Sequence, residues 1–108
     1  MGEEDPLLVL CTCPEAESAA RIARALVEEH LAACVNRLPG LASTYRWRGT
    51  VHDDHEVLLL IKTRRGRFEA LRSRLVGLHP YELPEVIALE IADGQAPYLD
   101  WLRDATRA

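Results

Sequence analysis

The chain has 108 residues, a formal net charge of −4 and 48% hydrophobic residues. This length fits a single domain, and the apolar content excludes intrinsic disorder. The balance of 13 basic against 17 acidic residues disfavours a general nucleic-acid binder, which carries a basic excess. No apolar run approaches the ~20 residues of a membrane span, and the acidic start differs from a signal peptide. We therefore expect one soluble, cytoplasmic domain over residues 1–108, with residues 1–5 as a flexible tail.

The first half of the chain predicts a strand, a helix and a long interrupted strand. An apolar run that ends at a proline is typical of a buried strand, and proline is favoured in the first turn of a helix. Because proline cannot donate to a sheet ladder, Pro39-Gly40 predicts an interruption or bulge. The expected elements are a strand over 6–13, a helix from Pro14 to Glu29 or His30, and strand segments over 32–38 and 41–48.

The second half predicts a return strand, a helix, a strand and a final helix. Gly49 marks the turn of a long hairpin. The loop from His79 to Glu85 contains two prolines, which fix its backbone and keep it out of the preceding helix. The expected elements are a strand over 50–63, a helix over 66–78, a strand over 85–92 and a helix over 95–105.

The order of these elements predicts an α+β fold. A βαββαβ order with an added C-terminal helix is the ferredoxin-like pattern, in which helices cover one face of an antiparallel sheet. The second face is normally left to water, and its strands should then alternate between apolar and polar residues. Residues 7–10 and 57–61 are apolar on both faces. We therefore predict that further copies of the chain cover the second face.

Six segments, taken together, carry a family resemblance. They are Val9–Pro14, Leu31–Asn36, Tyr45–Gly49, Glu56–Thr63, His79–Glu85 and Tyr98–Leu102. In order and spacing they resemble the CutA divalent-cation tolerance proteins. The resemblance implies a homotrimer of PII-like architecture, in which the long hairpin of the second and third strands reaches across neighbouring subunits. It also implies a role in divalent-cation tolerance and copper binding, with no established enzymatic activity.

The resemblance points to a metal centre. Cys11 and His79 match positions implicated in copper binding in the family, and Glu85 on the same proline-rich loop offers a carboxylate. Thiolate and imidazole are ligands that suit copper, and cysteine selects Cu(I) in particular. The family's best-known copper site has a second histidine directly before the position of His79, where this chain has Leu78. The competing interpretation is structural, with a buried strand cysteine and a loop histidine in ordinary hydrogen bonds.

The remaining cysteines and histidines allow two interpretations each. Cys13, beside the start of a helix, is either a thiol of lowered pKa or a buried residue near the helix cap. Cys34 is expected to pack in the core. The run His52–Glu56 carries two imidazoles and three carboxylates, but in a strand its side chains alternate between faces. A solvated hairpin arm therefore competes with a second cation site.

The aromatic residues favour contacts between subunits over ligand stacking, because aromatic side chains are enriched at interface cores. We predict Tyr45, Trp47 and Trp101 as oligomer interface residues. Three functions compete: a trimeric metal-tolerance protein, a PII-like sensor that binds a small ligand or protein partner in clefts between subunits, and an enzyme. No catalytic triad, paired catalytic carboxylates or P-loop stands out, so an enzyme is the least favoured.

Overall fold

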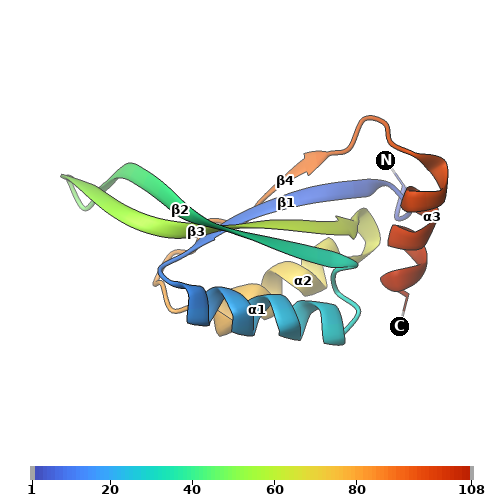
Figure 1. Ribbon diagram of the computed structural model, residues 1–108, viewed down its shortest axis with the longest axis horizontal. Helices are drawn as coiled ribbons and strands as arrows, with labels where there is room; N and C mark the ends of the chain where they lie inside the picture. The colour runs from blue at the N-terminus through green and yellow to red at the C-terminus, as the bar shows by residue number, and fades with distance from the viewer. Residues whose placement is uncertain (1, 108) are drawn as a thin grey trace.

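Residues 2–107, which the computed structural model describes, form a four-stranded antiparallel sheet and three helices (Figure 1). The strand order is β2-β3-β1-β4. Helices α1 and α2 lie side by side beneath one face of the sheet, and α3 lies at one end, close to both termini (Figure 1). The elements are β1 Pro6–Cys13, α1 Ala16–Glu28, β2 Cys34–Trp47, β3 Thr50–Arg64, α2 Arg65–Leu78, β4 Ile87–Glu90 and α3 Ala96–Ala105. Within residues 2–107, no helix is long and apolar enough to cross a membrane.

Each predicted element is present, with differences at the ends. Helix α1 is capped by Glu15, whose carboxylate accepts the Ser18 N–H at 3.1 Å, so the helix begins after Pro14. The last strand is shorter than the predicted 85–92, because β4 pairs with β1 only opposite Leu7–Leu10. The predicted flexible tail covers residues 1–5, of which Met1 lies outside the described residues. The backbone of this segment is hydrogen-bonded, since the Glu4 carbonyl accepts from Arg103 at 2.9 Å and the Asp5 carbonyl accepts from the Arg65 N–H.

The core lies between the sheet and helices α1 and α2. Alternate residues of β1 and β3 point to this side, and Val9, Leu59 and Ile61 are fully buried there. Leucine and isoleucine side chains of the two helices complete the same cluster. The helical spacing of apolar residues in the sequence correctly predicts this packing.

The opposite face of the sheet, which we call the open face, carries no helix (Figure 1). Its residues are the other alternating set: Leu8, Leu10, Leu58 and Leu60 are half-buried, while Leu38, Ile87 and Leu89 are exposed. Such a continuous apolar surface is unusual for a monomer. The structure thus agrees with the predicted second apolar face.

Strands β2 and β3 extend beyond the sheet as a hairpin arm, comprising residues 41–56. Strand β1 pairs with β3 only from Val57 to Arg64, so β2–β3 pairing is the only ladder that the arm makes with the described strands. The register shifts between Leu38 and Leu41, at the predicted Pro39-Gly40 interruption. Arg48 and Gly49 have φ values of 52° and 79°, as the two-residue turn of a twisted hairpin requires. A 2.7 Å ion pair from Arg48 to Glu82 ties the arm to the loop after α2.

Candidate metal centre

Three candidate ligands meet where β1 ends and α2 ends. The sulfurs of Cys11 and Cys13 and a ring nitrogen of His79 all lie within 4.8 Å of one another, and all three residues are buried. The two cysteines share a face of β1 because strand side chains alternate, and that face is turned toward the helices. His79 follows the last residue of α2, and its backbone N–H still bonds to the Leu75 carbonyl.

Two hydrogen bonds orient the His79 ring. The Tyr81 backbone N–H donates to His79 Nδ1 at 3.0 Å, so Nε2 carries the proton and donates to the Thr12 carbonyl at 2.8 Å. The ring therefore bridges β1 and the loop after α2. A metal ion at this ring must replace one of the two hydrogen bonds.

The two thiols influence each other's protonation. The hydrogen bond between them lowers the pKa of Cys13 and raises the pKa of Cys11, and burial raises the Cys11 pKa further. Cys13 is therefore the first of the pair to become a thiolate, which is the form that binds metals. Cys13 is also fully buried, as the competing sequence interpretation expects, and its lowered pKa comes from Cys11 and not from the start of the helix.

The structure brings together only part of the predicted ligand set. Cys11 and His79 meet, whereas Glu85 is not in the cluster, although its charge contributes to the raised pKa of Cys11. Cys13 is a third member of the cluster that was not among the predicted ligands. The signal was available, since a Cys-x-Cys pair in a strand places both sulfurs on the same face.

Glu85 instead lines a cavity of about 510 Å³ between the hairpin arm and the loop after α2. This cavity also contains Glu56, Trp47 and Tyr81. Glu56 lies on the open-face side of β3, directly before Val57, which pairs with Cys13. The cavity and the metal centre are therefore close neighbours on opposite sides of the sheet.

The acidic run His52–Glu56 does not form a second cluster of three ligands among residues 2–107. Its side chains bond across the arm instead: the Thr44 hydroxyl donates to Asp53 at 2.6 Å, and the Tyr45 hydroxyl donates to Asp54. His52 stacks on the Tyr45 ring at a centroid distance of 5.4 Å. The interpretation as an ordinary hairpin arm accounts for these contacts.

The remaining predicted residues are placed as follows. Tyr45 and Trp101 are exposed, on the arm and on α3, and Trp47 is half-buried in the cavity wall. Their contacts between subunits stay a prediction. Cys34, expected in the core, is half-buried on the open face instead, where Lys62 is its register partner. It begins a strand at the edge of the sheet, beyond the cover of the helices.

Comparison with known proteins adds to this geometry. The model of the CutA1 divalent ion tolerance family matches residues 7–105. This chain belongs to that family. It is 57% identical over 99 residues to the divalent-cation tolerance protein CutA of Thermus thermophilus, covering 92% of this chain and 96% of the relative. It is 47% identical over 97 residues to human protein CutA, covering 90% of this chain but only 54% of that relative.

Solved structures agree with this family membership. The CutA structure from Xylella fastidiosa superposes with a TM-score of 0.93 at 47% identity, covering 95% of this chain and 99% of that one. The Thermus thermophilus structure gives a TM-score of 0.92 at 55% identity, covering 94% and 99%. The predicted family resemblance is confirmed, together with an α+β fold of a four-stranded antiparallel sheet and three helices.

The relatives also correct the predicted location. The CutA proteins of Arabidopsis thaliana and rice are described as chloroplastic, and the Archaeoglobus fulgidus structure is described as that of a periplasmic protein. The prediction of a cytoplasmic protein is therefore wrong. The composition and charge of the domain do not encode its compartment, because the same fold is described in several.

Proposed function

We propose that this chain is a metal-binding protein of divalent-cation tolerance, and that it takes up copper at Cys11, Cys13 and His79. The observation that carries the proposal is the meeting of three donor atoms within 4.8 Å in a buried position. The ion is the protein's cargo, and no reaction is proposed for the site.

The donor set favours soft metal ions. Two thiolates and one imidazole suit Cu(I) and Zn(II), whereas hard ions such as Mg²⁺ prefer oxygen ligands. This chain has Leu78 where the family's copper site has a second histidine. Cys13 supplies a third donor in its place. Binding requires both thiols to lose their protons and His79 to exchange one hydrogen bond, so affinity should rise with pH.

We further propose that the subunit is ferredoxin-like and that three copies assemble as a PII-like trimer. The strand order and the element order support the first part. The apolar open face supports the second, because each copy has a surface that it cannot bury alone. Tyr45, Trp47 and Trp101 are proposed to anchor the contacts between copies.

Copper titration of the reduced 108-residue chain tests the metal proposal. We expect Cu(I) to bind tightly in competition with a chromophoric chelator, with Zn(II) weaker and Mg²⁺ undetectable by calorimetry. Cys13→Ser should weaken Cu(I) binding, and Cys11→Ser with His79→Ala should abolish it. Cys34→Ser is the matched control, since it also removes one thiol but lies outside the cluster. If the double variant binds Cu(I) as the unmodified chain does, the proposed centre is wrong.

A further inference from the structure

The loop after α2, residues 80–85, has few hydrogen bonds to hold it in place. Within the part of the chain that the structure describes, its backbone makes no hydrogen bond to another backbone group. The one backbone bond found there goes to a side chain, because the Tyr81 N–H donates to Nδ1 of His79 at 3.0 Å. Pro80 has no N–H, so Tyr81 supplies the first donor of the loop. The loop is therefore fastened at its start by a residue of the candidate metal centre.

The partners of the two ring nitrogens fix the tautomer of His79. A backbone N–H can only donate, so Nδ1 accepts from Tyr81 and carries no proton. A carbonyl can only accept, so Nε2 carries the proton and donates to Thr12 at 2.8 Å. Both nitrogens of this buried ring are thus satisfied by the chain itself.

Coordination at either nitrogen breaks the bond from Tyr81. When Nδ1 coordinates a metal ion, its lone pair is no longer available to the Tyr81 N–H. When Nε2 coordinates the ion, the single proton of the neutral ring lies on Nδ1, where it faces the Tyr81 N–H as donor against donor. The bond to Thr12 survives the first case but not the second. The bond from Tyr81 is lost in both.

The lost bond leaves the Tyr81 N–H without its acceptor. Tyr81 is half-buried, and a backbone donor that loses its partner away from water is costly. The loop relieves this cost by turning the Tyr81 peptide toward solvent or another acceptor. We propose that residues 80–85 form a metal-responsive loop, which is latched to Nδ1 of His79 in the absence of metal and released when the centre takes up Cu(I). This inference rests on the proposed function, because it needs His79 to be a metal ligand.

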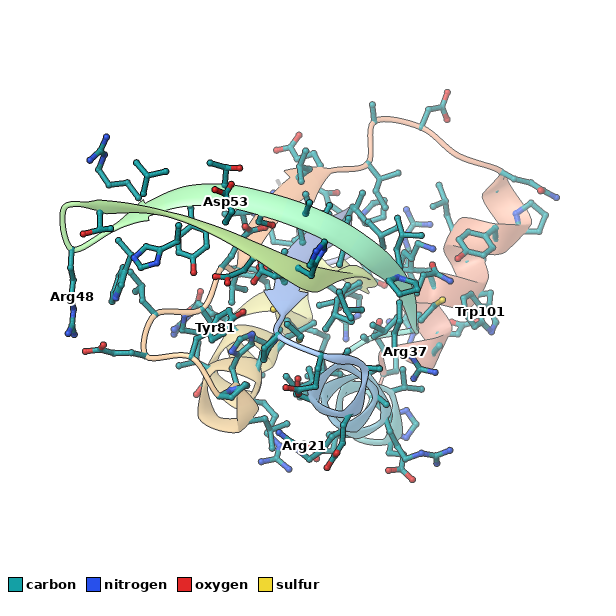
Figure 2. The ribbon with its side chains drawn as sticks, turned by 60° about the vertical axis from the view of Figure 1, so that its left-hand side comes forward. Arg21, Arg37, Arg48, Asp53, Tyr81 and Trp101 are labelled. Atoms are coloured by element: carbon teal, nitrogen blue, oxygen red, sulfur yellow. The ribbon has the colours of Figure 1, made fainter. Side chains whose placement is uncertain are left out.

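Two side-chain contacts favour the latched position of the loop. The Tyr81 hydroxyl donates to Glu56 at 2.7 Å, and Glu82 forms a 2.7 Å ion pair with Arg48. Figure 2 shows Tyr81 beneath the hairpin arm that carries Arg48. Neither contact includes a candidate metal ligand. Because coupling between two states is reciprocal, each contact that favours the latched loop opposes the uptake of Cu(I).

Amide hydrogen exchange of the 108-residue chain, followed by NMR with and without one equivalent of Cu(I), tests the latch. The Tyr81 amide should exchange at least tenfold faster once Cu(I) is bound, since its acceptor is lost. The His79 amide is the matched control, because it donates to the Leu75 carbonyl at 2.9 Å and should stay protected. Long-range proton–nitrogen spectra should show Nδ1 as the unprotonated ring nitrogen before Cu(I) is added, and a shifted Nδ1 signal afterwards. An unchanged Tyr81 exchange rate or Nδ1 signal in the loaded chain overturns the proposal.

Chelator competition in the same samples separates this inference from the proposed function. If Cu(I) does not bind, the metal centre is wrong and the metal-responsive loop falls with it. If Cu(I) binds and the Tyr81 amide stays protected, only the metal-responsive loop is wrong.

The His79→Ala variant tests the latch without metal. Its Tyr81 amide should exchange as fast as that of the loaded chain, because Nδ1 is absent. Circular dichroism establishes that the variant folds. Should the variant protect this amide as the unmodified chain does, His79 does not hold the loop.

The Tyr81→Phe variant tests the coupling between the loop and the metal centre. It removes the hydroxyl that bonds Glu56 but keeps the backbone N–H, so it should raise the affinity for Cu(I) about fivefold. Tyr98→Phe is the matched control, because it removes the same group from α3, away from the loop (Figure 1), and should change nothing. If the Tyr81 hydroxyl only supports the structure of the site, its loss weakens Cu(I) binding. Unchanged or weaker binding by Tyr81→Phe therefore overturns the coupling.

Discussion

Consecutive residues of strand β3 meet two different environments. Leu59 is fully buried against the helices, and Leu60, the next residue, lies half-buried on the open face. The two leucines have the same chemistry and the same strand pairing, since Leu59 lies opposite Cys11 and Leu60 opposite Leu10. The difference shows that the face toward the helices is a fully covered core, whereas the open face is an apolar surface that the chain does not cover.

The two faces therefore have different physical tasks. The covered face provides the free energy of folding of each chain through burial of apolar surface. The open face adds little to the single chain and becomes favourable only when another surface covers it. Substitutions on the two faces should therefore separate folding from assembly.

The largest effect is expected at Leu59. Leu59→Ala removes fully buried methyl groups and leaves a cavity in the core, so it should lower the free energy of unfolding by about 2–5 kcal/mol. Urea denaturation followed by circular dichroism measures this change at fixed protein concentration. A loss below about 1 kcal/mol would contradict full packing of the core around Leu59.

A smaller effect, and one of a different kind, is expected at Leu60. Leu60→Asn places an amide on the open face, where burial in an assembly would cost about 1–3 kcal/mol per subunit. The helix content should stay unchanged while the assembly dissociates at higher protein concentration, as measured by sedimentation velocity. Should Leu60→Asn sediment as the unmodified chain does over a dilution series, the open face does not hold the proposed trimer together.

The smallest effect is expected at an exposed ion pair between the two helices. Arg74 of α2 donates to the carboxylate of Glu29, the residue that follows α1, at 2.9 Å. The hydrogen bond from Arg74 lowers the pKa of Glu29 from its ordinary value of 4.5. The stabilisation is therefore fully present above pH 4.5 and lost as pH falls through the lowered pKa of the folded state.

The Glu29→Gln variant isolates this contribution. Its difference in free energy of unfolding from the unmodified chain should be small at pH 7, because the pair is exposed to solvent. The difference should shrink further as the pH is lowered, in thermal melts recorded from pH 7 to pH 3. A difference that grows toward low pH would have the wrong sign for a lowered carboxyl pKa.

The elements that could be predicted are those with a local signal. Alternating burial in β1 and β3, the bulge at Pro39-Gly40 and the turn at Gly49 all follow from residue types a few positions apart. The end of β4 could not be predicted in this way, because it depends on how far β1 extends beside it.

In the candidate site, too, only the residues with a signal in the sequence could be predicted. Cys11 and His79 were assigned through family resemblance, and the Cys-x-Cys spacing contains the reason why Cys13 joins them. The separation of Glu85 from that cluster could not be read from its place on the same loop as His79. Two prolines in this loop fix local backbone angles, but the side of the sheet on which each residue lies depends on the whole path of the loop.

The amino-acid sequence determines the elements, the covered face and the existence of a second apolar face, because hydrophobic periodicity and turn residues act over a few positions. Only the tertiary structure decides that Cys13 meets His79 across 66 positions of chain, and that Glu56 faces a cavity under the hairpin arm. Such meetings depend on strand register, on the end of α2 and on the bend of the arm. They arise only when distant segments pack together.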